Sequence, residues 1–528
     1  MGLLSINHAH AMNSNTGQTA TRLFFISLLG AAILRGIFNG ILPLSGEEAY
    51  YWMWSRYPDL CYFDHPPLIA WMIGISTTLL GHSVFAVRFS ALLCNTLTAV
   101  IIFCCTRRVT GDSGVAAWAG GFFLVAIFFA AMATLAIPDS YLFLFWALTL
   151  WLTIEATRGE KPLLWIAAGA ALGLCMLAKF HGILLALSLF TYLAVSGRQR
   201  RQFRNGRFFL GMLVAALFTL PILIWNIREG WPTFAFQFSH RQHYILGNPV
   251  YLLEMLTAPF AIMGLIIFPL SVVGAIWGLR KGLREQEDGV LFLSIACILP
   301  YAFFLLLSIV IKIDTQWSAP AFISGVILAA MLGAALMRNP ALPRWRRMLP
   351  LALKVNLVVL VITYAVPLLL LVFPDLIPRD LILAKHRQRR LNSSKIGELY
   401  GWEDIGKYVK DDLALLGGPR HAFIFARTGW CTASSLCFYS GGEADTFIFD
   451  RPPVDGHQFF IWEKRAAPQG MNAVVIAVKE KYMNLDFLRM YFERVERVPD
   501  LVISRGGLEQ QRFFLARAWN LRTKPNQF

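Results

Sequence analysis

The residues best suited to chemistry lie in a short connection between two strongly apolar segments near the start of the chain. This connection contains Glu47 and Glu48, directly before an Ala-Tyr-Tyr-Trp run, and then Asp64 and His65, directly before Pro-Pro-Leu. A carboxylate can accept a proton from a hydroxyl group or orient a nucleophile, and a simple connector needs no such group. We therefore interpret the connection as a candidate active site at a membrane surface.

Each part of this loop also has a purely structural interpretation. Ser45 and Glu48 have the spacing of a capping box, in which the glutamate side chain returns to the serine backbone N–H. Glu47 would then lie in the first helical turn, where the helix dipole favours an ionised carboxylate. Tyr51 and its aromatic neighbours fit an interfacial belt better than a sugar-stacking platform. Pro66-Pro67 fits the start of the next helix.

Further charged residues stand at the ends of apolar segments, where a charge is costly unless it is paired, hydrated or functional. Spacing alone favours Asp139, in Pro-Asp-Ser, as a helix N-cap. Lys179 is either a snorkelling lysine or a functional cation. Lys312 either pairs with Asp314 or binds a phosphate, and both alternatives remain open. The candidates for binding an anion are His65, Lys179, Arg241 and Lys312.

The composition describes a membrane protein with several spans. Of the 528 residues 56% are hydrophobic and only 15% are charged, which excludes a soluble globular protein. The net charge of +16 does not indicate nucleic-acid binding, because Arg and Lys gather in short loops between apolar segments. Apolar segments near the length of a membrane-crossing helix predict about eleven spans, at 22–44, 86–106, 115–136, 140–157, 162–178, 181–196, 208–226, 251–279, 289–311, 317–337 and 349–373.

Positive residues in alternate connections predict the orientation. One set of connections holds sixteen Arg and Lys residues and the other holds five, so the first set is expected in the cytoplasm. The acid-rich loop and the C-terminal region are then expected outside it, in the periplasm. The predicted organisation is a cytoplasmic tail (1–21), a helical membrane domain (22–373), a basic linker (374–391) and an exported α/β domain (392–528).

The C-terminal region alternates short apolar runs with helical stretches, which is typical of a small α/β domain. The expected strands lie at 421–427, 446–450, 459–463, 473–478, 501–504 and 513–516, with a helix at 402–412. Cys431 and Cys437 would face an oxidising compartment, and whether they form a disulfide stays open.

The combination of motifs resembles the dolichyl-phosphate-mannose–protein mannosyltransferase family and its bacterial relatives, including the aminoarabinose transferases that modify lipid A. Members carry an acidic pair, usually Asp-Glu, in the first outer loop, matched by Glu47-Glu48, and a following His-Pro-Pro-Leu, matched from His65. The bacterial members also have a Pro-Asp-Ser start to a span, matched at Asp139, and a hairpin like that around Lys179. The likeness covers roughly residues 22–320.

The resemblance implies a C-type glycosyltransferase fold with a polyprenyl-phosphate sugar as donor. It implies a glycolipid such as lipid A, or a protein, as acceptor at the outer face of a bacterial inner membrane. Glu47 takes the place of the catalytic aspartate, with Glu48 beside it and Asp139 as a second acid. Because glutamate is one methylene longer than aspartate, either the cavity is shaped for the longer acid or Glu48 carries the role. Asp64 and Tyr51 are further candidates for contact with the substrate. No cofactor is implied with certainty, and a divalent ion on Glu47 and Asp139 is left open.

Two other function classes compete with an inverting sugar transferase. A flippase or transporter would bind the same lipid-linked sugar without breaking its bond to phosphate, although transporters usually place their sites near the membrane midplane. A membrane scaffold would explain an exported domain but would leave the acids of the first loop without a purpose.

Overall fold

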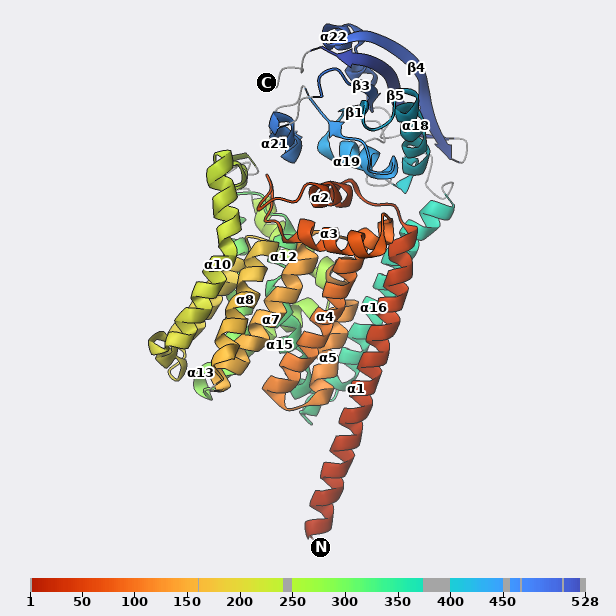
Figure 1. Ribbon diagram of the computed structural model, residues 1–528. Helices are drawn as coiled ribbons and strands as arrows, with labels where there is room; N and C mark the ends of the chain where they lie inside the picture. The colour runs from red at the N-terminus through yellow and green to blue at the C-terminus, as the bar shows by residue number, and fades with distance from the viewer. Residues whose placement is uncertain are drawn as a thin grey trace.

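The protein consists of a layer of helices with a smaller α/β domain on one side (Figure 1). The computed structural model describes residues 2–159, 161–240, 249–373, 399–449, 456–465, 468–505 and 508–522. We call the side that carries the C-terminal domain the domain face, and the opposite side the far face. Arg241 and the basic run at 385–390 lie outside the described residues.

Apolar helices long enough to cross a bilayer make up most of the layer. Seven described helices qualify: α1 (Gly2–Ile41), α4 (Val84–Thr110), α7 (Pro138–Arg158), α10 (Gly206–Glu229), α14 (Asp288–Leu307), α15 (Ala321–Arg338) and α16 (Trp345–Val372). An eighth crossing is present if α12 (Pro249–Met263) and α13 (Ile267–Arg284), which meet at 110°, count as one span. The prediction of a multi-pass membrane protein is confirmed.

The other three predicted spans correspond to shorter apolar helices. The segment expected at 115–136 is divided into α5 (Ser113–Val125) and α6 (Ile127–Ala131), because the backbone of Ala126 is extended. The remaining two are α8 (Pro162–Ala178) and α9 (Gly182–Val195). At about 1.5 Å per residue, helices of this length are shorter than a hydrocarbon core of about 30 Å. Eleven crossings therefore stay a prediction.

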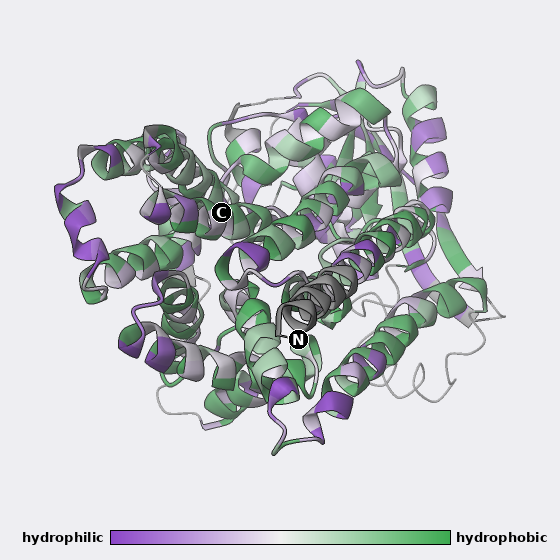
Figure 2. Cartoon of the chain, turned by 90° about the horizontal axis from the view of Figure 1, so that it is seen from below, coloured by the Kyte–Doolittle hydropathy of each residue, from purple (hydrophilic) through white to green (hydrophobic). Residues whose placement is uncertain are grey.

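The outer helices present apolar side chains to their surroundings, as a lipid-facing surface requires. Leu357, Val358 and Val361 of α16 are 50%, 58% and 58% exposed. An exposed apolar strip of this length is unfavourable in water but matches the interior of a bilayer. Figure 2 views the molecule from the far face, with hydrophilic residues at several turns between hydrophobic helices.

Two short helices lie across the domain face rather than through the layer (Figure 1). These are α2 (Gly46–Arg56) and α3 (Leu68–Leu80). Pro67 is the N-cap of α3, which confirms that the Pro-Pro pair starts a helix. Shorter elements in the remaining connections are η1 (Gln199–Arg204), α11 (Pro232–Ala235), η2 (Phe236–His240) and η3 (Thr315–Ser318).

The C-terminal domain is built on a five-stranded mixed sheet of order β2-β1-β3-β5-β4. Strand β1 is parallel to β2 and β3, whereas β5 is antiparallel to β3 and β4. The strands are β1 (Ala422–Arg427), β2 (Thr446–Phe447), β3 (Asn472–Ala477), β4 (Phe492–Arg505) and β5 (Leu508–Leu521). The helices are α18 (Trp402–Leu415), α19 (Trp430–Tyr439), α21 (Gln458–Arg465), η7 (Glu480–Tyr482) and α22 (Leu485–Tyr491).

Five of the six predicted strands and the predicted helix are present, although β4 and β5 are longer than expected. The strand expected at 459–463 is wrong, because this segment lies in α21. Its aromatic residues suggested a strand, but β-propensity is weak and tertiary contacts override it. Here Gln458, at the first turn of α21, contacts the first loop of the membrane domain.

The sheet has two buried faces, and one of them continues the core of the membrane helices. Ile424 and Ile476 belong to the same hydrophobic cluster as α4 and α7, whereas Phe425 and Val475, on the opposite side of the sheet, belong to a separate cluster with α22. This alternation follows from the two-residue period of a strand. The C-terminal domain is therefore packed onto the membrane domain through a shared core.

The contact between the two domains is made chiefly by α19 against α2. A Cβ atom added to Gly46 would lie 2.6 Å from the Cβ of Cys431, so only glycine allows this approach of the two helices. The Tyr439 hydroxyl accepts a hydrogen bond from the backbone N–H of Leu44 at 2.8 Å. Cys431 and Cys437 are both free thiols in this arrangement.

Candidate functional site

The first helical turn of α2 is fixed by reciprocal hydrogen bonds. The Ser45 hydroxyl accepts a bond from the Glu48 N–H (3.3 Å), and the Glu48 carboxylate accepts one from the Ser45 N–H (3.0 Å). The predicted capping box is confirmed. Because α2 begins at Gly46, Glu47 lies in the first turn, also as predicted.

Glu48 is also one half of a fully buried ion pair. The Nε and Nη2 atoms of Arg88 each donate to a different oxygen of the Glu48 carboxylate, both at 2.7 Å. The backbone N–H of Ala136 donates to Oε1 at 3.0 Å. Burial opposes ionisation, but the Arg88 charge and these hydrogen bonds outweigh it and lower the pKa of Glu48 below its ordinary value. Arg88 thus has the acid partner that a charge buried inside the helical layer requires.

Arg88 extends this pair to the end of α1. Its Nη1 and Nη2 atoms donate to the carbonyl oxygens of Asn39 (3.3 Å), Leu42 (2.7 Å) and Pro43 (2.7 Å). One guanidinium thus connects α1, α2 and α4, and through Glu48 the connection reaches the loop before α7. The predicted catalytic role of Glu48 stays a prediction; in this structure its contacts fix the start of α2, next to Glu47.

Glu47 differs from Glu48 in its surroundings. Its side chain is exposed, whereas every residue from Glu48 to Trp54 is buried. The helix dipole favours a negative charge at this position in the first turn. The structure therefore places an ionisable carboxylate at the surface of the domain face, on a helix end that Glu48 and Arg88 hold in place.

Asp139 and Lys179 form a second buried ion pair. The Lys179 ammonium donates to both carboxylate oxygens of Asp139, at 2.9 and 2.8 Å, and both residues are about 95% buried. The expected N-cap role is wrong, because Ile137 is the N-cap of α7 and Asp139 lies inside its first turn. Lys179 does not snorkel. It stands at the end of α8 and neutralises a carboxylate of α7.

Asp64 connects the first loop to the C-terminal domain. Its Oδ1 atom accepts a hydrogen bond from the Tyr50 hydroxyl (3.1 Å), and its Oδ2 atom lies 3.0 Å from Nδ1 of His457. The Gln458 N–H donates to the same Tyr50 hydroxyl at 2.9 Å. Burial and the nearby Asp64 charge raise the pKa of Tyr50 well above its ordinary value, so this hydroxyl stays protonated as the donor to Asp64.

The aromatic residues of α2 are buried beneath the C-terminal domain. Tyr50 and Trp54 are fully buried, and Tyr50 lies 4.5 Å from Trp430 of α19 between ring centroids. The expected interfacial belt is therefore wrong for these rings, which pack in a domain contact. Tyr51 is 6% exposed, and its ring centroid lies 6.2 Å from that of His65, which is 8% exposed.

The remaining predicted residues lie apart from these buried pairs. Lys312 and Asp314 are both exposed in the connection before α15. Among the described ion pairs none joins Lys312 to Asp314, and a contact of Lys312 with a phosphate stays a prediction. Arg241 lies outside the described residues, so its predicted role stays a prediction.

The residues do not fit the divalent ion that the sequence left open. Both oxygens of Asp139 already accept from the Lys179 ammonium, and a metal would have to displace that cation. Within the described ranges no group of three or more His, Cys, Asp or Glu side chains is placed to hold a metal ion.

Sequence reasoning missed His457 and Gln458. They come from the C-terminal domain, about 390 positions after their partners Asp64 and Phe63, whose backbone N–H donates to the Gln458 side chain at 2.8 Å. Nothing in the local sequence distinguishes this His-Gln pair from a solvent-exposed one. The contact depends on how the two domains pack.

Comparison with known proteins confirms the predicted resemblance. Residues 64–225 match the dolichyl-phosphate-mannose-protein mannosyltransferase family. This match begins after Glu47 and includes Asp64, His65, Asp139 and Lys179.

Two curated relatives illustrate the match beyond the family segment. A lipid A galacturonosyltransferase of Rhizobium johnstonii is 27% identical over 54% of this chain and 60% of its own length. An undecaprenyl phosphate-α-4-amino-4-deoxy-L-arabinose arabinosyl transferase of Enterobacter is 27% identical over 55% of this chain and 53% of its own length. The matched region thus spans little more than half of these relatives.

The fold is similar to that of a solved bacterial protein over almost the whole chain. The crystal structure of ArnT from Cupriavidus metallidurans in the apo state has a TM-score of 0.61 at 18% identity, covering 94% of this chain and 98% of that one. The same protein bound to undecaprenyl phosphate gives a TM-score of 0.60. The predicted C-type glycosyltransferase fold with a C-terminal sheet domain is confirmed.

Proposed function

We propose that this protein is an inverting membrane glycosyltransferase that moves a sugar from a polyprenyl-phosphate donor to lipid A or a related core glycolipid. One curated relative is named as a transferase that acts on lipid A, which supports the proposed acceptor. The other is named for an undecaprenyl-phosphate-linked sugar, which supports the proposed donor. The excess of Arg and Lys on the far face supports a periplasmic location for the domain face in a bacterial inner membrane.

The observation that carries the proposal is the contrast among the acids of the domain face. Glu48, Asp64 and Asp139 are buried and each contacts a side chain that fixes it. Glu47 is exposed at the start of a helix that two of these contacts hold rigid. A positioned and accessible carboxylate is what a general base needs, because its geometry decides the rate as much as its pKa does.

In the proposed reaction Glu47 accepts the proton of the acceptor hydroxyl as that oxygen attacks the anomeric carbon. The bond between this carbon and the phosphate oxygen breaks, and its electron pair leaves with the polyprenyl phosphate. Lys312 and Arg241 are the proposed contacts for the departing phosphate, since preorganised positive charge stabilises a developing anion. Lys179 and His65, which are both buried, are further candidates to stabilise the phosphate. The Asp139–Lys179 pair would also orient the donor.

Glu47 departs from the aspartate that is usual at this position in the family. The extra methylene moves the carboxylate outward by more than the tolerance of a catalytic geometry. We propose that the substrate site around Glu47 is arranged for the longer acid. Glu47→Asp should then lower the transfer rate, even though it restores the usual residue.

The test uses the full-length protein in lipid nanodiscs with a labelled undecaprenyl-phosphate aminoarabinose donor and lipid A. We expect Glu47→Gln to lower the rate on the order of 10²–10⁴-fold, the usual contribution of a general base. Glu443→Gln, which removes an exposed glutamate of the C-terminal domain, should leave the rate unchanged. Wild-type transfer by folded Glu47→Gln protein would overturn the role of Glu47.

The same assay separates transfer from transport. A transferase releases undecaprenyl phosphate when the acceptor is present, whereas a flippase moves the intact donor. If the aminoarabinose donor is not used, mass spectrometry of envelope lipids from cells with and without the protein identifies the sugar. Movement of intact donor without release of lipid phosphate would contradict the proposed function.

A further inference from the structure

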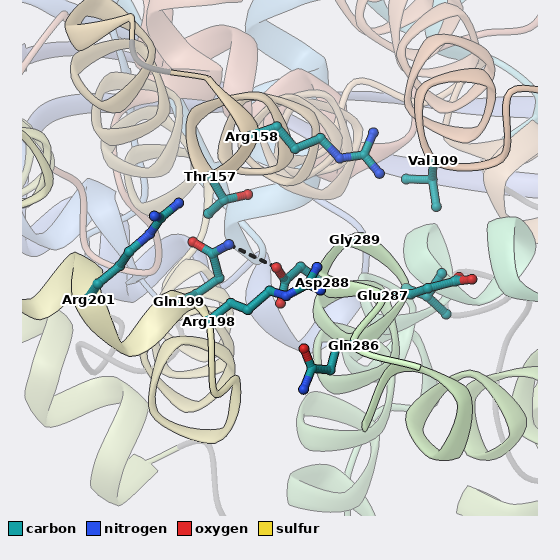
Figure 3. A pocket seen from close by; sticks show the side chains of 11 residues that line it. Val109, Thr157, Arg158, Arg198, Gln199, Arg201, Gln286, Glu287, Asp288 and Gly289 are labelled. Atoms are coloured by element: carbon teal, nitrogen blue, oxygen red, sulfur yellow. Dashed lines mark hydrogen bonds between the residues drawn. The ribbon is translucent and has the colours of Figure 1, made fainter. Parts of the chain in front are cut away.

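The far face contains a polar pocket that the proposed reaction does not use (Figure 3). Its volume is about 480 Å³, and it lies where the ends of α4 and α7, the short helix η1 and the start of α14 meet. Its charged and polar lining includes Arg158, Arg198, Gln199, Arg201 and Asp288. The pocket is on the side of the layer opposite Glu47.

Three arginines line this pocket without a carboxylate partner in the part of the chain that the structure describes. Arg158 donates to the carbonyl oxygen of Arg108 at 2.7 Å, and neither Arg198 nor Arg201 takes part in a described ion pair. All three are exposed at the pocket. A predicted cytoplasmic location explains positive charge on this face, but it does not require the charges to gather around one cavity.

The acid at the centre of the pocket is held by neutral groups. The Asp288 carboxylate accepts hydrogen bonds from the Ser196 hydroxyl (2.7 Å) and the Gln199 side-chain amide (2.8 Å). Figure 3 draws the second of these bonds. Asp288 thus attaches η1 to the start of α14 and places Arg198 and Arg201 at the rim. The other acid of the lining, Glu287, pairs with Lys281 at 2.7 Å.

The start of α14 leaves room for a ligand. No described side chain caps its first turn, and the lining includes Gly289 and Val290 of that turn. A Cβ atom added to Gly289 would lie 3.6 Å from Nη2 of Arg158 and 3.3 Å from a methyl group of Val109. Glycine therefore keeps open the space between the Arg158 guanidinium and the helix start.

We propose that this pocket binds a phosphate group. Guanidinium groups match the geometry of phosphate oxygens with paired N–H donors, and the backbone N–H groups at a helix start add to the attraction. The pocket lies at the ends of three membrane-crossing helices, α4, α7 and α14, where a phospholipid headgroup and a soluble phosphate can both be present. The common chemistry is a phosphate anion held by three arginines.

The test measures binding to the purified full-length protein and needs no transfer activity. One arm titrates inorganic phosphate into protein in neutral detergent, with isothermal calorimetry as the readout. In the other arm the protein is placed in nanodiscs of phosphatidylglycerol or of phosphatidylcholine, and native mass spectrometry then counts the lipids that it retains. The variant Arg158→Gln/Arg198→Gln/Arg201→Gln should lose at least about 10-fold in affinity, the range expected for charge-assisted bonds.

The matched control is Arg344→Gln/Arg346→Gln/Arg347→Gln, which removes three arginines from the same face but outside the pocket. It should change affinity less than 2-fold. Gly289→Val fills the pocket without altering charge and should also abolish binding. Binding of inorganic phosphate assigns a soluble ligand, and binding of phosphatidylglycerol alone assigns a headgroup. Equal losses in both triple variants, or no binding in either arm, would overturn the proposal.

Discussion

The two faces of the membrane layer use positive charge in different ways. On the domain face, Arg88 and Lys179 are buried, and each lies within 2.9 Å of a buried carboxylate. On the far face, Arg108 and Arg338 also pair with acids, but these two arginine side chains are 47% and 67% exposed. Arg198 and Arg201 of the same face line an open pocket. Buried ion pairs fix the arrangement of the helices that carry them. Exposed cations set the orientation of the protein in the membrane and remain accessible to anions.

This difference explains how the candidate site obtains its rigidity. A buried charge without a partner is strongly unfavourable, so each pair on the domain face specifies one arrangement of the helices that carry it. An exposed pair is hydrated in either arrangement and specifies little. Substitutions on the two faces should therefore differ in their effect on stability.

The largest effect should come from Arg88→Met. This change leaves the Glu48 carboxylate buried and removes the donors to three carbonyl oxygens, one in the last turn of α1 and two in the α1–α2 connection. Breaking a buried pair from one side costs about 3–5 kcal/mol, and we expect the upper end here. The free energy of unfolding in detergent measures it. A double variant Glu48→Met/Arg88→Met should recover part of the loss, and no recovery would contradict the charge explanation.

Lys179→Met should have a smaller effect, of roughly 3 kcal/mol, because it removes one partner of Asp139 and no further bonds to the backbone. The same unfolding measurement applies. Lys312→Met, at an exposed position on the same face, serves as the stability control. If both variants unfolded alike, the Asp139–Lys179 pair would not hold α7 and α8 together.

Lowering the pH should gradually weaken the ion pair between Glu48 and Arg88. The pKa of Glu48 in the folded protein is lowered from its ordinary value of 4.5, so its stabilisation is present above that value and is lost as the pH falls through the folded pKa. The stability difference between wild type and Glu48→Gln should therefore be constant near neutral pH and shrink below pH 4.5. Midpoints of thermal unfolding from pH 3 to 7 measure it, and a difference independent of pH would exclude this linkage.

The smallest effect should come from Arg338→Gln on the far face. Its ion pair with Asp112 is exposed, and pairs of this kind contribute about 0–1 kcal/mol. We expect less than about 1 kcal/mol in the same unfolding assay. A loss comparable to that of Arg88→Met would remove the proposed distinction between the two faces.

Much of the fold could be predicted because the bilayer leaves few choices. Long apolar segments predicted the spanning helices, and the Ser45 and Glu48 spacing predicted the start of α2. The division of the predicted span at 115–136 was missed, since the extended backbone at Ala126 has no signal in composition. The helix α21 was predicted as a strand for a similar reason, because its contacts with the first loop are distant in sequence.

The sequence by itself determined that this is a multi-pass membrane protein, that its acids gather in the first loop, and that Glu47 lies in a first helical turn. These properties depend on local spacing and on transfer of residues from water to lipid. Only the tertiary structure decided which side chains the buried acids contact. Arg88 lies 40 positions from Glu48, Lys179 lies 40 from Asp139 and His457 lies 393 from Asp64. Contacts at such separations depend on how helices and domains pack, because a buried charge is strongly unfavourable without a partner.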